Sequence, residues 1–196
     1  MRYFMGIDVG TNETKAVLID EKCEIVAFAS CGHDLLNPQP GFFEHDAEKT
    51  WWGDFCHLSR QLLAESGVDA KDVGCVGLSA LGCDCVPVDA EGTALCNAIL
   101  YGVDSRSHKE IEYYGKEEAE RLYGHELCSS DIAPKILWVK NNLPDVYAKT
   151  AKFLTGSSYL CAKLTGKFTI DRYLAEDFAP LYNLTNDTVD EEHCGL

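Results

Sequence analysis

The residues best suited to chemistry lie near the N-terminus, in the run Asp8-Val9-Gly10-Thr11-Asn12-Glu13-Thr14-Lys15. A carboxylate such as Asp8 at a strand end can hold Mg²⁺ directly or through water, because hard cations prefer oxygen ligands. Gly10 lets the backbone turn tightly and approach a phosphate, since it has no Cβ. Thr11 and Asn12 offer side-chain donors, and Lys15 offers positive charge to phosphate oxygens. The spacing favours a phosphate-binding turn, although the same residues also suit an ordinary exposed hairpin.

A second pair of useful side chains, Asp104 and Arg106, follows a short apolar stretch at Ala98–Tyr101. A carboxylate and a guanidinium at this spacing at a strand end can bracket adjacent hydroxyl groups of a polyol. The alternative is a helix N-cap at Asp104 beside a solvated Arg106. The residues alone leave both interpretations open.

The elements that must position the first motif are three strands in quick succession. They are expected at Tyr3–Val9, Thr14–Ile19 and Glu24–Ser30. Each is rich in apolar or β-branched residues, and short turns separate them. This order predicts an antiparallel meander, which differs from the strand–helix alternation of a dinucleotide-binding unit.

A helix follows the meander, with Asp46 as its expected N-cap, Trp51 and Trp52 packed on its apolar face, and Gly67 as its end. A buried strand is expected at Val73–Ser79. Shorter strands are expected at Cys85–Val88 and Ala98–Tyr101, and helices at Ser107–Tyr123, Pro134–Asn142 and Ser157–Leu164. This order predicts an α/β fold with a mixed sheet.

The charge balance restricts the class of partner. The chain has 196 residues and a formal net charge of −15, from 32 acidic and 17 basic side chains. Nucleic acids and anionic membranes attract basic patches, so neither is expected as a partner. No stretch reaches the roughly 20 apolar residues that cross a bilayer, and the N-terminus lacks a secretory signal pattern. The sequence therefore predicts a cytoplasmic protein.

Ten cysteines raise the question of disulfides or a metal centre. The chain contains no pair of cysteines with two residues between them, and the six histidines show no zinc-binding spacing. Cys83 and Cys85 lie too close along an extended strand for ordinary disulfide geometry. The cysteines are therefore interpreted as reduced structural thiols in a reducing compartment.

The first motif has the form Asp-x-Gly-Thr-x-x-x-Lys, and it resembles the first phosphate motif of the actin-like ATPase and sugar kinase superfamily. Within that group the chain is similar to the N-terminal domain of the FGGY carbohydrate kinases, and closest to xylulokinase-like members. Further segments carry the resemblance in the expected order along nearly the whole chain: Pro40–Asp46 with Trp51-Trp52, Ala98–Arg106, Lys135–Trp138, Leu154–Gly156 and Thr169–Ala175.

The resemblance implies a ribonuclease H-like fold and ATP-dependent phosphorylation of a sugar or polyol, with a xylulose-like pentulose favoured. It implies ATP and Mg²⁺ as cofactors, a small-molecule sugar as partner, and leaves a homodimer open. Asp8 is then the catalytic residue that organises the metal. The expected phosphate-binding residues are Gly10, Thr11, Asn12 and Lys15, and the expected sugar-binding residues are Asp104, Arg106 and Cys83.

Two features separate this chain from the family pattern. Related kinases place larger polar residues where Leu81, Gly82 and Cys83 stand, so recognition of glycerol through an Arg–Glu pair is not expected. By resemblance, the general base and the second, nucleotide-binding domain lie beyond this segment. Residues 1–196 are therefore expected to be an incomplete N-terminal domain with little activity alone.

Two other functions are compatible with parts of the sequence. A non-catalytic lobe would bind sugar or phosphate and need a partner lobe. An ATP-dependent activator of 2-hydroxyacyl-CoA dehydratases shares the first hairpin, but it has no place for the segments around Trp51 and Arg106.

Overall fold

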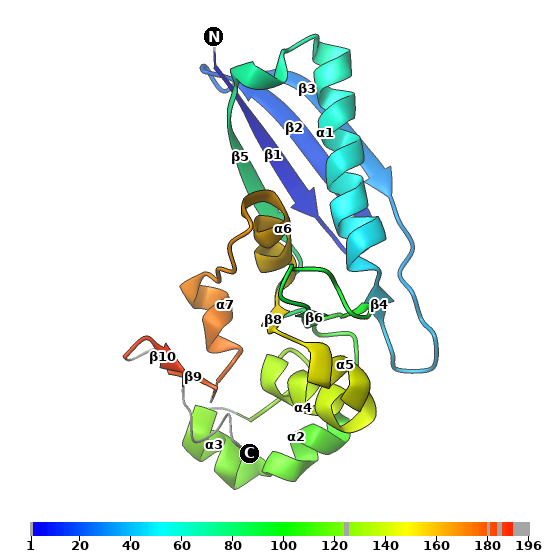
Figure 1. The fold of residues 1–196 in the computed structure, drawn as a ribbon, viewed down its shortest axis with the longest axis vertical. Helices are drawn as coiled ribbons and strands as arrows, with labels where there is room; N and C mark the ends of the chain where they lie inside the picture. The colour runs from blue at the N-terminus through cyan, green and yellow to red at the C-terminus, as the bar shows by residue number, and fades with distance from the viewer. Residues whose placement is uncertain (1, 124–125, 180, 184–185, 190–196) are drawn as a thin grey trace.

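The computed structural model describes residues 2–123, 126–179, 181–183 and 186–189. Its main sheet contains β1 (Tyr3–Val9), β2 (Glu13–Asp20), β3 (Ile25–Gly32) and β5 (Val73–Ala80), in the order β3-β2-β1-β5. The first three strands are antiparallel neighbours, and β5 runs parallel to β1 (Figure 1). The predicted meander and mixed sheet are therefore confirmed.

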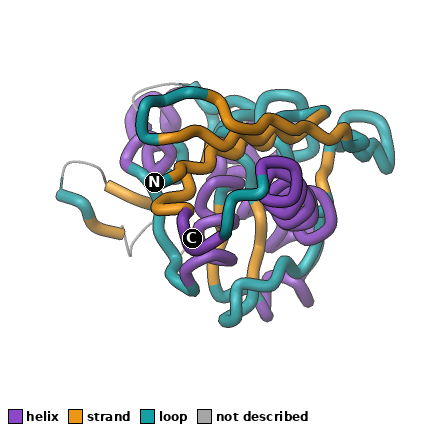
Figure 2. The backbone as a smooth tube through the Cα atoms, turned by 90° about the horizontal axis from the view of Figure 1, so that it is seen from above, coloured by secondary structure: helices purple, strands orange, loops and turns teal. Residues whose placement is uncertain are grey.

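One face of this sheet is covered by the helix α1 (Gly53–Ser66). The apolar side chains of β1 and β2 alternate, so that Met5, Ile7 and Leu18 point to the same core as Leu58 and Leu62 of α1. Figure 2, seen from above, shows a purple helix alongside the orange strands of the sheet. The opposite face carries exposed side chains.

The start and end of this helical segment follow from its capping residues. Asp46 accepts a hydrogen bond from the Lys49 N–H, as predicted for an N-cap. The first turns, Ala47–Trp52 (η1), form a π-helix, a widened form that is rare in proteins. Gly67 ends α1 with a left-handed backbone (φ 69°), and its N–H bonds to the Leu63 carbonyl.

The prediction of a buried strand at Val73–Ser79 was correct for the strand and wrong for its burial. β5 lies at the edge of the four-stranded sheet, and its residues are half-buried or exposed along their whole length. The apolar composition of the segment did not reveal this exposure. Gly74 and Gly77 count as apolar residues but have no side chain to bury.

Short strands and helices make up the rest of the molecule. Most of them lie below the sheet in Figure 1, whereas the short helix η2 (Ala70–Asp72) between α1 and β5 lies at the top of the sheet. The strands form two-stranded pairs: β4 (Glu44–His45) with β7 (Ala98–Ile99), β6 (Val86–Val88) with β8 (Lys152–Leu154), and β9 (Tyr182–Asn183) with β10 (Thr188–Val189). The other helices are α2 (His108–Tyr114), α3 (Lys116–Tyr123), α4 (Ile132–Asn142), α5 (Pro144–Lys149), α6 (Gly156–Thr165) and α7 (Arg172–Glu176).

The helix predicted at Ser107–Tyr123 is in fact two helices. Gly115 separates α2 from α3 with a φ of 71°, a backbone conformation that only glycine adopts readily. The helices predicted at Pro134–Asn142 and Ser157–Leu164 are confirmed as α4 and α6. In the described part of the chain, no helix is both long enough and apolar enough to cross a membrane.

Candidate functional site

The predicted phosphate-binding turn forms the connection between β1 and β2. The Gly10 N–H donates to the Glu13 carbonyl at 3.0 Å and closes the turn. A Cβ at Gly10 would lie 3.0 Å from that same oxygen, so a larger residue would force the turn open. The structure thus explains why glycine stands at this position.

Asp8 and Lys15 lie side by side on the sheet face opposite α1. They are partners in the register of β1 and β2, and Asp8 is also opposite Ser79 of β5. All three line an open groove of about 380 Å³ that runs along the uncovered face of the sheet. Asp8 is exposed, so its carboxylate is accessible from solvent.

Lys15 bonds to a neighbouring carboxylate in this structure. Its Nζ lies 2.9 Å from Glu13 Oε1, and this hydrogen bond, with the charges of Glu13 and Asp8, raises the lysine pKa. About half of each side chain in the pair is exposed. An exposed ion pair contributes little to stability, so Lys15 can exchange Glu13 for another anion at low cost.

A buried polar network lies behind the turn, on the α1 side of the sheet. His33, which directly follows β3, is 2.8 Å from Asp54 of α1 and 3.0 Å from the Gly10 carbonyl. His45 of β4 is 3.1 Å from the Thr11 carbonyl. Neither histidine was predicted as a site residue, because no local pattern joins them to a turn more than 20 residues away.

A second polar group lies just beyond the end of β5. The Cys83 thiol donates to Asp177 at 2.7 Å. Burial, and then Asp177, raise the Cys83 pKa to about 12, so the sulfur remains a neutral thiol. Lys135 of α4 is fully buried, and its Nζ donates to the carbonyls of Cys83 and Ser130. Neither Asp177 nor Lys135 was predicted as a site residue.

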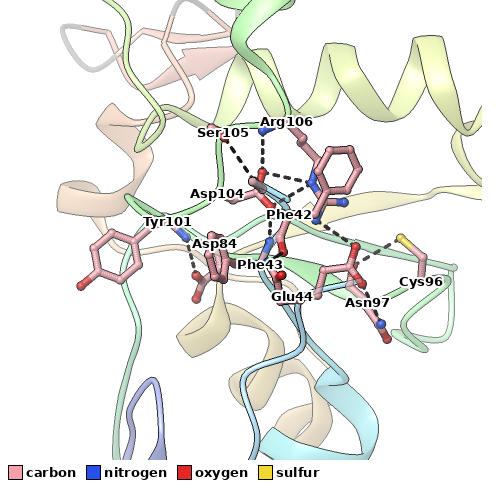
Figure 3. Close-up of polar contacts among 12 residues, drawn as sticks. Phe42, Phe43, Glu44, Asp84, Cys96, Asn97, Tyr101, Asp104, Ser105 and Arg106 are labelled. Carbon is pink, nitrogen blue, oxygen red and sulfur yellow. Dashed lines mark hydrogen bonds and ion pairs between the residues drawn. The ribbon is translucent and has the colours of Figure 1, made fainter. Parts of the chain in front are cut away.

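The carboxyl group of Asp84 is fully buried in the same region. Its Oδ1 accepts from the Tyr101 N–H (Figure 3), and its Oδ2 has no hydrogen-bond partner among the described residues. Burial raises the Asp84 pKa to about 7. Gly156, at the start of α6, comes so close that a Cβ there would lie 3.2 Å from Oδ2.

Asp104 and Arg106 face each other within the protein (Figure 3). The Asp104 carboxylate accepts bonds from the Phe43 N–H and from the backbone and guanidinium of Arg106. Arg106 also pairs with Glu44 at 2.9 Å, and its guanidinium lies over the rings of Phe42 and Trp138. Asp104 is 1% exposed and Arg106 6% exposed. The pair therefore joins three segments of the chain, and its assignment to a sugar stays a prediction.

The cysteines show no redox or metal site in the part of the chain that the structure describes. All nine described cysteines are free thiols, and the tenth, Cys194, lies outside the described residues. No group of three histidine, cysteine or acidic side chains is arranged to hold a metal ion within those same ranges. Asp8 alone still suits Mg²⁺, which binds through one or two carboxylates while phosphates and water complete its shell.

Comparison with known proteins gives a consistent family. Residues 3–195 match the model for the FGGY family of carbohydrate kinases, N-terminal domain. A xylulose kinase of Bacillus subtilis is 28% identical over 169 residues, which make up 85% of this chain and 34% of that protein. A glycerol kinase of Thermococcus gammatolerans is 25% identical over 198 residues, or 97% of this chain and 40% of that protein.

A solved structure shows the same fold. The xylulose kinase of Rhodospirillum rubrum superposes with a TM-score of 0.85 at 24% identity, over 99% of this chain and 40% of that one. This likeness confirms the predicted actin-like ATPase fold. The chain spans about a third of the length of the curated xylulose kinases that it matches.

Proposed function

Because this chain belongs to the FGGY family of carbohydrate kinases, as an N-terminal domain, we propose that it is one lobe of an enzyme that transfers a phosphoryl group from ATP to a sugar or polyol. The observation that carries the proposal is the turn between β1 and β2, where Asp8 and Lys15 flank a glycine-dependent bend beside an open groove. A xylulose-like pentulose is the favoured substrate, since xylulose kinases are prominent among the relatives.

Each residue of the turn has a proposed part in the reaction. Asp8 would hold Mg²⁺, which neutralises phosphate charge when bound with ATP. The backbone at Gly10, with Thr11 and Asn12, would cradle phosphate oxygens. Lys15 would exchange its bond to Glu13 for a bond to a phosphate. Phosphoryl transfer depends mainly on such positioning and charge stabilisation.

The sugar would bind near the end of β5, where Cys83 and Asp177 lie together. The Asp177 carboxylate is half-buried and offers an acceptor to hydroxyl groups. Asp104 and Arg106 would reach the sugar only if their present bonds opened. They stay predicted sugar ligands, and their contacts also support a role in fixing the loop that contains Phe43.

The alternative is a lobe without activity of its own that binds sugar or phosphate and completes its site with a partner lobe. The uncovered face of the sheet, with Asp8 in its groove, supports this alternative. The incomplete domain, cytoplasmic location and homodimer remain predictions.

A phosphoryl-transfer screen of the full-length protein tests the proposal. The substrates would be pentuloses, pentitols, hexonates and glycerol, each with MgATP. The substitution Asp8→Ala is expected to abolish turnover of any accepted sugar, because it removes the proposed metal ligand. Asp72→Asn, at an exposed carboxylate at the far end of the sheet, serves as the matched control. Full activity in Asp8→Ala would overturn the assignment of the turn.

A further inference from the structure

We propose that His33 and His45 form a clamp that holds two successive carbonyl groups of the phosphate-binding turn, with His33 acting as an imidazolium fixed by Asp54. This histidine clamp consists of His33, His45, Asp54 and Trp51. The proposal rests on the proposed function for the role of the turn, and on the structure alone for the clamp.

The hydrogen-bond partners of His33 determine its number of protons. Its Nδ1 faces Asp54 Oδ2 at 2.8 Å, and its Nε2 faces the Gly10 carbonyl at 3.0 Å. Both partners are acceptors, so both bonds form only if a proton lies on each side of the ring. Imidazole is a stronger base than a carboxylate, so the shared proton belongs to His33. The ring is therefore a cation beside the Asp54 anion.

His45 is a neutral ring, and its hydrogen-bond partners determine which of its nitrogens carries the proton. The Trp51 indole N–H can only donate, and it lies 2.9 Å from His45 Nδ1, which must therefore accept. The single ring proton then lies on Nε2 and is donated to the Thr11 carbonyl. Burial, and then the nearby His33, lower the His45 pKa to about 4, which agrees with a neutral ring.

The surroundings hold the two rings in place. The ring centroids are 4.9 Å apart in an edge-to-face arrangement, and the His33 side chain is only 6% exposed. The Thr14 hydroxyl donates to the same Asp54 oxygen at 2.8 Å. Cys31 also faces this carboxylate, and burial, and then Asp54, raise the Cys31 pKa to about 11, so the thiol adds no charge.

Because the peptide bond is planar, the clamp also sets the direction of two N–H groups in the turn. In a planar trans peptide, the carbonyl and the following N–H point in opposite directions. The bonds to the carbonyls of Gly10 and Thr11 therefore aim the N–H groups of Thr11 and Asn12 away from the buried histidines. Among the described residues, neither N–H has a hydrogen-bond acceptor. The clamp thus presents two oriented donors of the kind that bind phosphate.

The test begins with the unsubstituted chain, by long-range ¹H–¹⁵N nuclear magnetic resonance of the histidine rings. We expect His33 to carry protons on both ring nitrogens and His45 to carry one, on Nε2. We also expect the Thr11 amide signal to shift when His33→Gln replaces the ring that bonds to the Gly10 carbonyl. A His33 ring with one bare nitrogen, or a Thr11 amide signal that stays unchanged in His33→Gln, would overturn the clamp.

Variants then test whether the clamp orders the turn. With His33→Ala, the backbone order parameters of Thr11 and Asn12 should fall from about 0.85 to below about 0.6. His33→Gln keeps one donor for Gly10 and should restore part of that order. His57→Gln, at an exposed histidine of α1, is the control and should change nothing. An ordered turn in His33→Ala contradicts the proposal, and circular dichroism verifies that each variant folds.

Binding of MgATP separates the clamp from the proposed function. We expect His33→Ala to weaken MgATP binding, measured by titration calorimetry, and to raise the KM for ATP more than the KM for sugar. If the turn loses its order and MgATP binding stays the same, the clamp stands and the phosphate assignment of the turn fails.

Discussion

The carboxyl group of Asp84 shows how burial alone changes the chemistry of a single residue. Its pKa rises from an ordinary 3.8 to about 7, chiefly through desolvation, while the Tyr101 N–H and Lys135 oppose the rise only in part. In the unfolded chain the same carboxyl returns to its ordinary value. The folded protein therefore binds one more proton than the unfolded chain between these two pH values.

The sign of the resulting pH dependence follows from this proton. The stabilising contribution of protonated Asp84 is complete below about pH 4 and is lost as the pH rises through about 7. Removing the carboxyl group should abolish this loss. We expect the free energy of unfolding of Asp84→Asn, relative to the unsubstituted chain, to increase with pH across that window by at most ~4 kcal/mol.

Urea unfolding at several pH values measures this difference. Asp72→Asn, which changes an exposed carboxylate, should show no comparable trend. If the free energies of unfolding of Asp84→Asn and the parent chain differ by the same amount at every pH, Asp84 does not titrate in this way.

At the residue scale, local spacing was enough to predict the turn itself. Asp8, Gly10 and Lys15 lie close together in the chain, and strand pairing brings Asp8 opposite Lys15. Contacts such as Cys83 with Asp177 join residues 94 positions apart. Nothing in the local pattern encodes such a pair, because only the packed fold brings the two together.

At the scale of elements, the ion pair of Asp104 and Arg106 holds together parts of the chain that are distant in sequence. The carboxylate binds the Phe43 N–H ahead of β4, and the guanidinium lies over the rings of Phe42 and of Trp138 in α4. Both charges are almost completely buried. Removing one partner of such a pair leaves an uncompensated charge in the interior, and this costs much more than an exposed pair contributes.

We therefore expect Arg106→Ala to lower the free energy of unfolding by about 3–5 kcal/mol, measured by urea denaturation. Arg106→Lys should recover little, because an ammonium group cannot reproduce the bidentate and stacked contacts. Arg60→Ala, at an exposed arginine of α1, provides the matched control. A cost below about 1 kcal/mol for Arg106→Ala would show that the pair does not hold these elements together.

The elements themselves were largely predictable, and the exceptions have physical causes. Alternating apolar residues predicted β1 and β2, and capping residues predicted the helical segment after Asp46. The break at Gly115 was missed because helical periodicity continues across it. The edge position of β5 was missed because strand neighbours depend on the whole topology.

At the scale of the whole molecule, the uncovered side of the sheet is the most unusual feature. Phe28 of β3 is 57% exposed on that side, and Val76 of β5 is 37% exposed on the other side, where its register partner is Met5. Among the described residues, β5 has a neighbouring strand on one side only. An exposed strand edge with apolar residues favours pairing with another chain. The net charge of −15 opposes such pairing, because copies of the chain repel each other.

These two effects predict self-association that depends on salt. We expect sedimentation velocity to show more dimer at high ionic strength, where charge repulsion is screened. Val76→Lys should reduce that dimer. Val103→Lys, which adds the same charge at an exposed loop residue away from the sheet, should reduce it less. Equal effects of the two substitutions would mean that total charge, and not the sheet edge, controls association.

The same uncovered face has a consequence for mutational tolerance. A polar residue in place of Phe28 removes little buried surface from this chain, so its fold should accept the change. If a living cell nevertheless does not tolerate that change, another surface must cover the sheet at this position. The pattern of accepted substitutions on this face would thus map the contact that natural selection has maintained.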